Sequence, residues 1–322
     1  MRAKISGTGS YLPKTIMTNH DLAQKLETSD EWIRQRVGII SRHIASGEET
    51  NTFMATEAAK KALTAAKVSA EQIDLIIVAT STSELIMPSM ATQVQGALGI
   101  QHHCMAFDIS AACTGFVYAL GIANQFFNSG AVKHAIVIGA ERMSRVLNWE
   151  DRATCVLFGD GAGAVVLSAS DEPGIIATRM HSDGVNKELL FIPNNLATQP
   201  FSALVPEAHL MMEGNKVFKH AVNMLEEVVD QILVDSGFSK TDVDWLVPHQ
   251  ANERIITATA KKLDMPMTKV VLTLSHHGNT SAASVPLALD AAVKDGRIKR
   301  GDLLLLEAFG AGFVWGAALV RY

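Results

Sequence analysis

Hydrophobic and polar positions alternate along this chain in a pattern that predicts strands separated by helices. Short apolar runs rich in β-branched residues occur at 73–79 and 134–139, and a third run, interrupted by glycines, occurs at 155–168. A helical pattern at 55–67 precedes the first of these runs. Strands that are apolar along their whole length must be covered on both faces, so this alternation indicates an α/β fold.

The second half of the chain follows the same order as the first. A helical pattern at 219–236 leads into the strand-like VDWLVP at 243–248. A glycine-rich strand pair is expected near the end of each half, at 156–167 and at 303–320. We therefore expect two similar α/β halves, 1–170 and 171–322, although a chance likeness of two α/β segments would give the same pattern.

Charge and cysteine usage narrow the classes of function. The net charge of −5 argues against a general nucleic-acid or membrane-surface role, because both need a basic face. No stretch reaches the roughly 20 apolar residues that span a bilayer, and the N-terminus lacks the pattern of a signal peptide. Three cysteines, an odd number, make a disulfide framework unexpected and favour a cytoplasmic location.

Cys113 lies where a predicted strand, AFDIS, turns into a predicted apolar helix at 116–127. Unpaired N–H groups and the positive end of the helix dipole are expected to lower the pKa of a thiol at this position. Small neighbouring residues leave room for a thioester. The pattern favours a nucleophile, with an ordinary buried thiol as the alternative.

The other cysteines lack this setting. Cys155 falls in the strand-like run TCVLF and is expected in the core. Cys104 follows two histidines, but three adjacent residues cannot converge on one ion from a strand or helix. We therefore expect no metal site.

His249 and Asn279 are the candidate partners of Cys113. His249 directly follows an apolar strand in VPHQANERI, and Asn279 lies in a Gly-Asn-Thr-Ser turn before an apolar helix. Side chains at strand ends of an open α/β sheet gather at one edge, so both can meet a cysteine from the other half. A single histidine is more often structural, and His276 and His277 are interpreted in that way.

A series of motifs, in order from residue 4 to residue 322, resembles β-ketoacyl-acyl-carrier-protein synthase III. These motifs are GTGSYLP, TSDEWI, DISAACTGF, FGDGAGA, EGNKVFK, PHQAN, HHGNTSAAS and AFGAGFVWGA. The family starts type II fatty acid synthesis. The resemblance covers essentially the whole chain and implies a thiolase-like fold, in which two similar α/β halves form a layered α-β-α-β-α core.

The resemblance also implies a Cys113–His249–Asn279 triad. Cys113 would take the acyl group of a short acyl-CoA, and His249 and Asn279 would stabilise the enolate left when malonyl-acyl-carrier protein loses CO₂. The products would be 3-oxoacyl-acyl-carrier protein, CoA and CO₂, with no cofactor. Elongating condensing enzymes carry a second histidine instead of the asparagine. Thiolases carry a second cysteine in the loop that here reads FGAG, at 309–312.

The same resemblance implies residues for the substrates. Trp32 and Arg152 are similar to a pair that sandwiches the adenine of CoA. The remaining CoA and pantetheine positions are Thr28, Arg36, Asn215, Phe218 and Asn252. The oxyanion and acyl pocket would be formed by Phe309, Gly310, Ala311 and Met87. From the residues alone, Trp32 could equally be a core aromatic and Asn215 a turn residue.

A basic stripe on a predicted helix after His249 suits an acidic carrier protein. This stripe consists of Arg254 and of Lys261 and Lys262, which follow it by seven and eight positions. At this spacing the three side chains are expected to share one face of the helix. An ordinary solvated face is the alternative. The predicted carrier-protein surface is Gln250, Ala251, Asn252, Glu253, Arg254, Lys261 and Lys262.

Met87 is a departure from the family pattern. Relatives often place a large aromatic residue before the proline of this loop, where it reaches the acyl pocket of the partner subunit in a homodimer. A flexible methionine would admit a longer or branched primer. Three other interpretations keep the same residues: a specialised-metabolite synthase, an inactive acyl-binding scaffold and a cysteine hydrolase.

Overall fold

The computed structural model describes residues 2–194 and 208–322. Within these residues, one main sheet has the strand order β1 (Arg2–Tyr11), β7 (Asp160–Ser170), β6 (His134–Arg142), β4 (Leu75–Ala79) and β5 (Met105–Ile109). The other main sheet has the order β11 (Trp245–Pro248), β12 (Leu303–Gly310), β13 (Val314–Arg321) and β8 (Ile175–Ser182).

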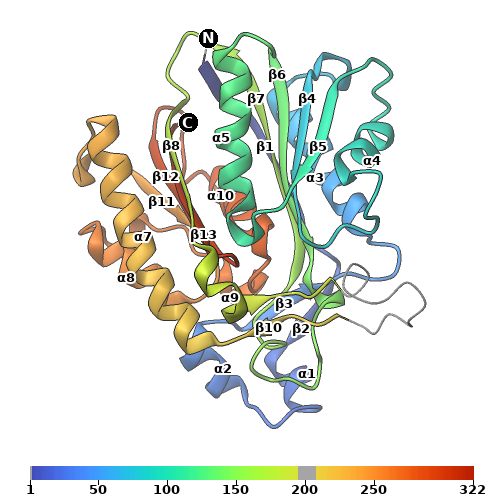
Figure 1. The fold of residues 1–322 in the computed structure, drawn as a ribbon, viewed down its shortest axis with the longest axis vertical. Coiled ribbons are helices and arrows are strands. Elements are labelled where there is room, and N and C mark those ends of the chain that lie inside the picture. The colour runs from blue at the N-terminus through green and yellow to red at the C-terminus, as the bar shows by residue number, and fades with distance from the viewer. Residues whose placement is uncertain (1, 195–207) are drawn as a thin grey trace.

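Helices form three layers around these two sheets (Figure 1). The central layer is α5 (Gly115–Asn128) and α10 (Ser284–Lys294). The outer layers are α3 (Asn51–Ala66) with α4 (Met90–Ala97) and α7 (Gly214–Ser236) with α8 (Glu253–Lys262). This layering confirms the expected α-β-α-β-α core. In the described part of the chain, no helix is both long enough and apolar enough to cross a bilayer.

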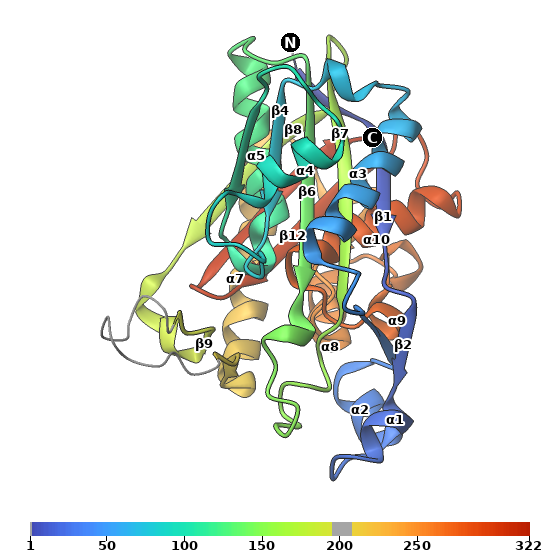
Figure 2. The same cartoon turned by 90° about the vertical axis from the view of Figure 1, so that its right-hand side faces the viewer.

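Smaller elements gather at the end of the sheets where α5 begins (Figure 1; β9 is labelled in Figure 2). Strands β2 and β3 pair with each other, as do β9 and β10. The elements are β2 (Thr15–Thr18), α1 (Asn19–Ala23), α2 (Asp30–Val37), β3 (Ser41–Ile44), β9 (Leu190–Phe191), β10 (Met211–Met212) and α9 (Leu274–His277). These elements lie beyond the ends of the main-sheet strands, and several of them line the cavity described below.

The two main sheets have the same topology over four strands. In the order β1-β7-β6-β4 the first two pairings are antiparallel and the third is parallel, and β8-β13-β12-β11 follows the same sequence of directions. A parallel bridge between Leu246 and Val270 stands beside β11 where β5 stands beside β4. The expected boundary at residue 170 falls between β7 and β8, but the division into two domains stays a prediction.

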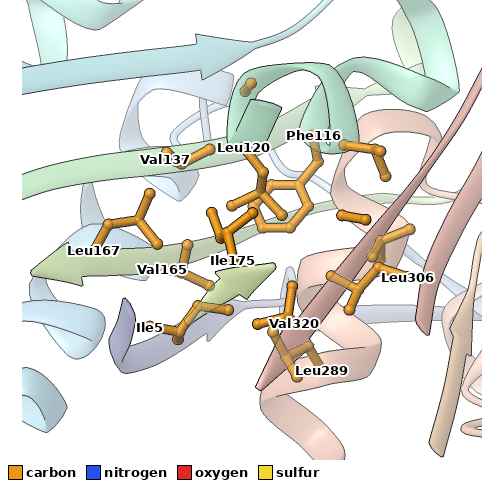
Figure 3. Close-up of a cluster of buried hydrophobic side chains, with 14 of the residues drawn as sticks. Ile5, Phe116, Leu120, Val137, Val165, Leu167, Ile175, Leu289, Leu306 and Val320 are labelled. Carbon is orange, nitrogen blue, oxygen red and sulfur yellow. The ribbon is translucent and has the colours of Figure 1, made fainter. Parts of the chain in front are cut away.

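One apolar cluster fills the space between the sheets and joins both halves. Figure 3 shows Phe116 and Leu120 of α5 among side chains of β1, β6, β7, β12 and β13, with Leu289 of α10 beside them. Burying large side chains at this seam contributes roughly 25 cal/mol for each Å² of apolar surface. The seam therefore holds rigidly together the strand ends and helix starts that carry the predicted site residues.

Several predicted boundaries shift in the structure. Strand β1 continues through the N-terminal GTG, where Gly7 and Gly9 let α3 approach: a Cβ on Gly9 would meet the carbonyl oxygen of Ala58 at 2.3 Å. Helix α3 begins at Asn51 because the Thr50 side chain caps it. The strand pair expected at 156–167 is a single strand, β7, that begins at Asp160. Cys155 is buried as expected but lies in a turn.

Candidate active site

A cavity of about 1600 Å³ joins the predicted catalytic and substrate-binding residues. Its lining includes the buried residues Cys113, His249 and Asn279 at one end. At the other end it is lined by exposed cationic side chains, namely those of Arg36, Arg152, Lys187, Lys219 and Arg254. The space therefore leads from a basic, solvated surface to a dry interior, which suits a ligand with an anionic head and an apolar tail.

Cys113 sits in the one-turn 3₁₀ helix η2 (Ala112–Thr114), between β5 and the first residue of α5. Gly310, the last residue of β12, packs directly against it. A Cβ on Gly310 would lie 2.8 Å from the backbone N of Cys113. Only glycine therefore allows the 309–312 loop to approach the nucleophile so closely. The loop predicted to form the oxyanion pocket thus packs against the backbone of the predicted nucleophile.

The thiol of Cys113 is not activated in the way the sequence predicted. Complete burial raises the pKa of Cys113 to about 12, and the nearby carboxylate of Glu141 acts in the same direction. The expectation of a lowered pKa is wrong, because the desolvation of a buried thiolate outweighs the helix N-terminus. At neutral pH the sulfur carries its proton, and the proton must leave during attack.

His249 is held as a neutral imidazole. Its backbone N–H donates to the carbonyl of Glu307 at 2.8 Å, and its Nδ1 lies 2.6 Å from the Ser284 hydroxyl. Burial lowers the pKa of His249 to about 3. A Ser284 hydroxyl that donates to Nδ1 leaves the imidazole proton on Nε2, where it can serve as a hydrogen-bond donor.

Asn279 is fixed by both halves of the molecule. Its backbone N–H donates to the carbonyl of Leu157, and its own carbonyl accepts from Gly159 N at 3.0 Å. Its side-chain oxygen accepts from the backbone N of Ser281 at 2.8 Å. With that oxygen engaged, the amide nitrogen is the group that can act on a ligand.

Some of the predicted CoA-binding residues line the cavity in the structure, and others do not. Trp32 is half-buried and lines the cavity, with the guanidinium of Arg152 5.4 Å and that of Arg36 5.5 Å from its ring centre. Asn215, Phe218 and Asn252 also line the cavity, and so do Phe309 and Ala311. Thr28, Met87 and Gly310, all described residues, are not among the lining side chains. Met87 is 83% exposed, whereas its neighbour Ile86 does line the cavity.

The predicted carrier-protein surface needs two corrections. Lys262 does not share the exposed face of Arg254 and Lys261, because its ammonium pairs with Glu226 and Asp230 of α7 at 3.1 and 3.0 Å. Gln250 is buried, so it cannot meet a partner. Glu253, Arg254 and Lys261 remain exposed, and Ala251 and Asn252 are half-buried.

Gln250 instead supports the turn that carries the site. Its amide donates to the carbonyls of Pro248 and Val271, and its side-chain oxygen accepts from the backbone N of Thr273 and of Leu274. Gln250→Ala is expected to lower the free energy of unfolding by on the order of 3 kcal/mol, since it leaves buried backbone groups unpaired. Chemical denaturation measures this change. Lys261→Ala, on the exposed face, is the control, with an effect below about 0.5 kcal/mol; equal effects would contradict the assignment.

Several residues in or next to the cavity were not predicted from the sequence. Lys187 and Lys219 line the cavity, and neither was predicted, although Lys219 ends the EGNKVFK motif that holds Asn215 and Phe218. Ser281 and Glu141, which form a hydrogen-bonded chain with Cys113, were also not predicted. Glu141 lies at the end of the apolar strand β6, and side chains at strand ends are candidates for a site in an α/β sheet. In the described residues, no group of three or more His, Cys, Asp or Glu side chains could hold a metal ion. All three cysteines are free.

The fold and the cavity together define a class of protein. Two sheets of the same topology enclose two central helices, and a cysteine at the start of one of them lines the same cavity as a histidine and an asparagine from the other half. This is the arrangement of a thiolase-fold acyltransferase that condenses acyl groups through a cysteine.

Comparison with known proteins narrows the class. Residues 107–184 match the family 3-Oxoacyl-[acyl-carrier-protein (ACP)] synthase III, and residues 233–322 match its C-terminal family. A beta-ketoacyl-[acyl-carrier-protein] synthase III of Alkalilimnicola ehrlichii is 58% identical, with 99% of each chain covered. The chain belongs to the β-ketoacyl-[acyl-carrier-protein] synthase III family, the condensing enzymes that start fatty acid synthesis from an acyl-CoA.

Solved structures agree with this membership. The 3-oxoacyl-[acyl-carrier-protein] synthase III of Aquifex aeolicus is 50% identical, with a TM-score of 0.93 over 99% of this chain and 100% of that one. The priming β-ketosynthase of the R1128 polyketide biosynthetic pathway is 36% identical, also with a TM-score of 0.93, over 99% of this chain and 96% of that one.

Proposed function

We propose that Cys113, His249 and Asn279 carry out the condensation of a short acyl-CoA with malonyl-acyl-carrier protein. The observation that supports this most directly is that all three buried residues line one cavity. The products are 3-oxoacyl-acyl-carrier protein, CoA and CO₂. The proposed steps need no metal or redox cofactor.

In the first half-reaction, Cys113 attacks the thioester carbon of the acyl-CoA. The sulfur loses its proton, the bond from the acyl carbon to the CoA sulfur breaks, and an acyl-enzyme forms. We assign the stabilisation of the oxyanion to backbone N–H groups of Cys113 and of the adjacent 310–311 loop, because Gly310 packs against the backbone N of Cys113. The apolar walls of the cavity, including Phe309 and Leu210, keep water from the thioester and thus disfavour hydrolysis.

In the second half-reaction, malonyl-acyl-carrier protein loses CO₂ and the resulting carbanion attacks the acyl group on Cys113. Negative charge develops on the thioester oxygen of the malonyl group. Neutral His249 and the amide nitrogen of Asn279 each donate to that oxygen. Neutrality is essential for this role in a dry site, because a charged imidazole would have to be desolvated.

The basic end of the cavity suits the phosphates of CoA. Trp32 offers an aromatic ring with two guanidinium groups near it, an environment for the adenine ring. Arg254 stacks on Phe218 at 5.0 Å and borders both the cavity and the exposed face of α8. We assign the carrier protein to the face that contains Arg254 and Lys261.

We infer a homodimer in the cytoplasm as the working form. Leu85, Ile86 and Met87 form an exposed apolar loop, with Ile86 and Met87 more than three-quarters exposed. Covering this loop with a second copy removes apolar surface from water. Three free thiols suit a reducing compartment.

A second candidate is priming of a polyketide rather than a fatty acid. The likeness to the R1128 priming β-ketosynthase, at 36% identity over nearly the whole chain, favours it. The two functions share the cysteine chemistry and differ in the primer and the acceptor. Strict dependence on the malonyl carrier protein of fatty acid synthesis would exclude this candidate.

The primer range is tested by incubating the enzyme with acyl-CoAs of increasing length and weighing the intact protein. With Met87 in the exposed loop, we expect acyl-enzyme to form with acetyl-CoA and also with C4–C8 acyl-CoAs. Each acyl-enzyme is then offered malonyl-acyl-carrier protein, and release of 3-oxoacyl-acyl-carrier protein is measured. Met87→Phe is the matched control and should narrow the range toward short primers. Turnover of acetyl-CoA alone would contradict the expected range, and no acyl-enzyme with any primer would contradict the function.

A further inference from the structure

Two successive hydrogen bonds link the Cys113 thiol to a buried carboxylate. The Cys113 thiol donates to the Ser281 hydroxyl, with 3.5 Å between sulfur and oxygen. The Ser281 hydroxyl in turn donates to Oε1 of Glu141 at 3.2 Å. All three side chains are buried, and Glu141 is inaccessible to solvent. A hydroxyl can accept one proton while donating another, so this arrangement can carry a proton from sulfur to carboxylate.

We propose that Glu141 is a proton store for Cys113 and exchanges its proton with the thiol through Ser281. The inference rests on the proposed role of Cys113 as the nucleophile. It deepens that role by assigning the acceptor of the thiol proton, which the condensation chemistry leaves open. Because Glu141 acts through Ser281, it is a positioning residue for proton transfer and does not touch the substrate.

The charges favour this route. A thiolate beside an ionised Glu141 would place two negative charges in one dry site, which is unfavourable because neither charge is solvated or paired with a cation. Proton transfer through Ser281 leaves Cys113 and Glu141 with one negative charge between them. The charge is on the Glu141 carboxylate before the transfer and on the Cys113 sulfur after it. His249 is a poor alternative acceptor, because its pKa is about 3 and its N–H is needed as a donor.

The pKa of Glu141 suits a reversible store. Burial raises it to about 7, against the opposing effect of hydrogen bonds from Thr82, Ser81, Ser281 and Thr80. A carboxyl that titrates near neutral pH can both accept and return a proton.

The groups that the described structure shows donating to Glu141 are uncharged. The groups that face it after β4 are the Thr80 and Thr82 hydroxyls and the Ser81 N–H. From α3, Asn51 donates to Thr80. From β7, the residue paired with Glu141 is Gly161, and η7 (Ser281–Ala283) supplies Ser281. Among the described residues, Cys113 is the titratable group whose pKa this carboxylate shifts.

The backbone holds Ser281 in place for this role. Its φ is 49°, in the left-handed region that a non-glycine residue adopts at a cost, and Ala112, beside Cys113, has a φ of 44°. The two residues stand at equivalent places, in the one-turn helices that precede α10 and α5. Since η2 and η7 pack against each other, the relay crosses the interface between the two halves.

The proton balance closes over one catalytic cycle. In acyl transfer, the S–H bond of Cys113 breaks, its proton passes to Ser281, and the Ser281 proton passes to Glu141. The sulfur bonds to the acyl carbon, and CoA leaves as a thiolate that takes a proton from solvent. In condensation, CO₂ leaves, the carbanion takes the acyl group, and the Cys113 thiolate recovers its proton from Glu141 through Ser281.

The relay is tested by the rate of acyl-enzyme formation in a single turnover between pH 5 and pH 9. In the wild type the rate is expected to rise through about pH 7, because the acceptor is the ionised carboxylate. Glu141→Gln should lower the rate about 100-fold and remove this inflection, since an amide accepts no proton. Ser281→Ala should do the same while keeping the backbone N–H that orients Asn279. The double variant should be no slower than either single one.

Alkylation of Cys113 by iodoacetamide gives a second readout that needs no acyl-CoA. A relay predicts slower alkylation of the Glu141→Gln enzyme. A purely electrostatic role predicts faster alkylation, because loss of the carboxylate would lower the pKa of the thiol. Faster or unchanged alkylation would overturn the proposal.

Two controls separate a relay from structural damage and from failure of the proposed function. Glu141→Asp keeps an acid and should restore the pH inflection, which a merely structural role would not do. If the wild type takes up no acyl group, the proposed function fails. If the wild type is acylated and the Glu141→Gln and Ser281→Ala enzymes match its rate and pH profile, only the relay fails.

Discussion

Replacement of Cys113 by alanine is expected to abolish acyl loading. The acyl-enzyme is a thioester to this sulfur, and no other group in the proposed site can replace it. Intact-protein mass spectrometry after incubation with acyl-CoA should show a mass increase for the wild type and none for the variant. Overall condensation should fall by a factor on the order of 10³ or more, since the covalent route is lost.

The other two cysteines provide matched controls for this experiment. Cys104 is half-exposed and Cys155 is buried away from the cavity, so Cys104→Ala and Cys155→Ala should keep the acyl mass increase. Acyl groups found on the Cys113→Ala protein would show that another residue is the nucleophile. Loss of loading in Cys104→Ala would point to a general effect on folding.

Replacement of His249 or Asn279 by alanine should impair decarboxylation much more than acyl loading. Each side chain supplies one donor to the enolate oxygen, and removal of one such donor lowers the rate by about 10²–10³-fold. The two half-reactions can be followed separately, by the mass of the acyl-enzyme and by release of CO₂ from malonyl-acyl-carrier protein. The pH profile of decarboxylation should show no His249 ionisation above pH 5, because the pKa of this imidazole is about 3.

Ser284→Ala tests the orientation of this imidazole. The Ser284 hydroxyl lies 2.6 Å from Nδ1 of His249, so its loss should weaken decarboxylation while the donor itself remains. Equal losses of loading and decarboxylation in the His249→Ala and Asn279→Ala enzymes would contradict the division of roles.

Local sequence patterns predicted several of the strands and helices that form the layers of the fold. Continuous apolar runs predicted β4 and β6, and apolar periodicity predicted α5 and the approximate extent of α3. Motif resemblance over the whole chain predicted the family and the Cys113, His249 and Asn279 set. The start of α3 differs from the predicted one, because the Thr50 side chain caps the helix earlier than the apolar pattern indicated.

The sequence by itself therefore determined the elements, the family and the residue types of the site, because these depend on periodicity and on motifs along the chain. Only the tertiary structure decided the state of those residues. Burial raised the pKa of Cys113 instead of lowering it, and contacts with distant segments placed Gln250 inside and paired Lys262 with α7. The Cys113–Ser281–Glu141 chain joins residues up to 168 positions apart, and desolvation and proximity of this kind exist only after the two halves have packed.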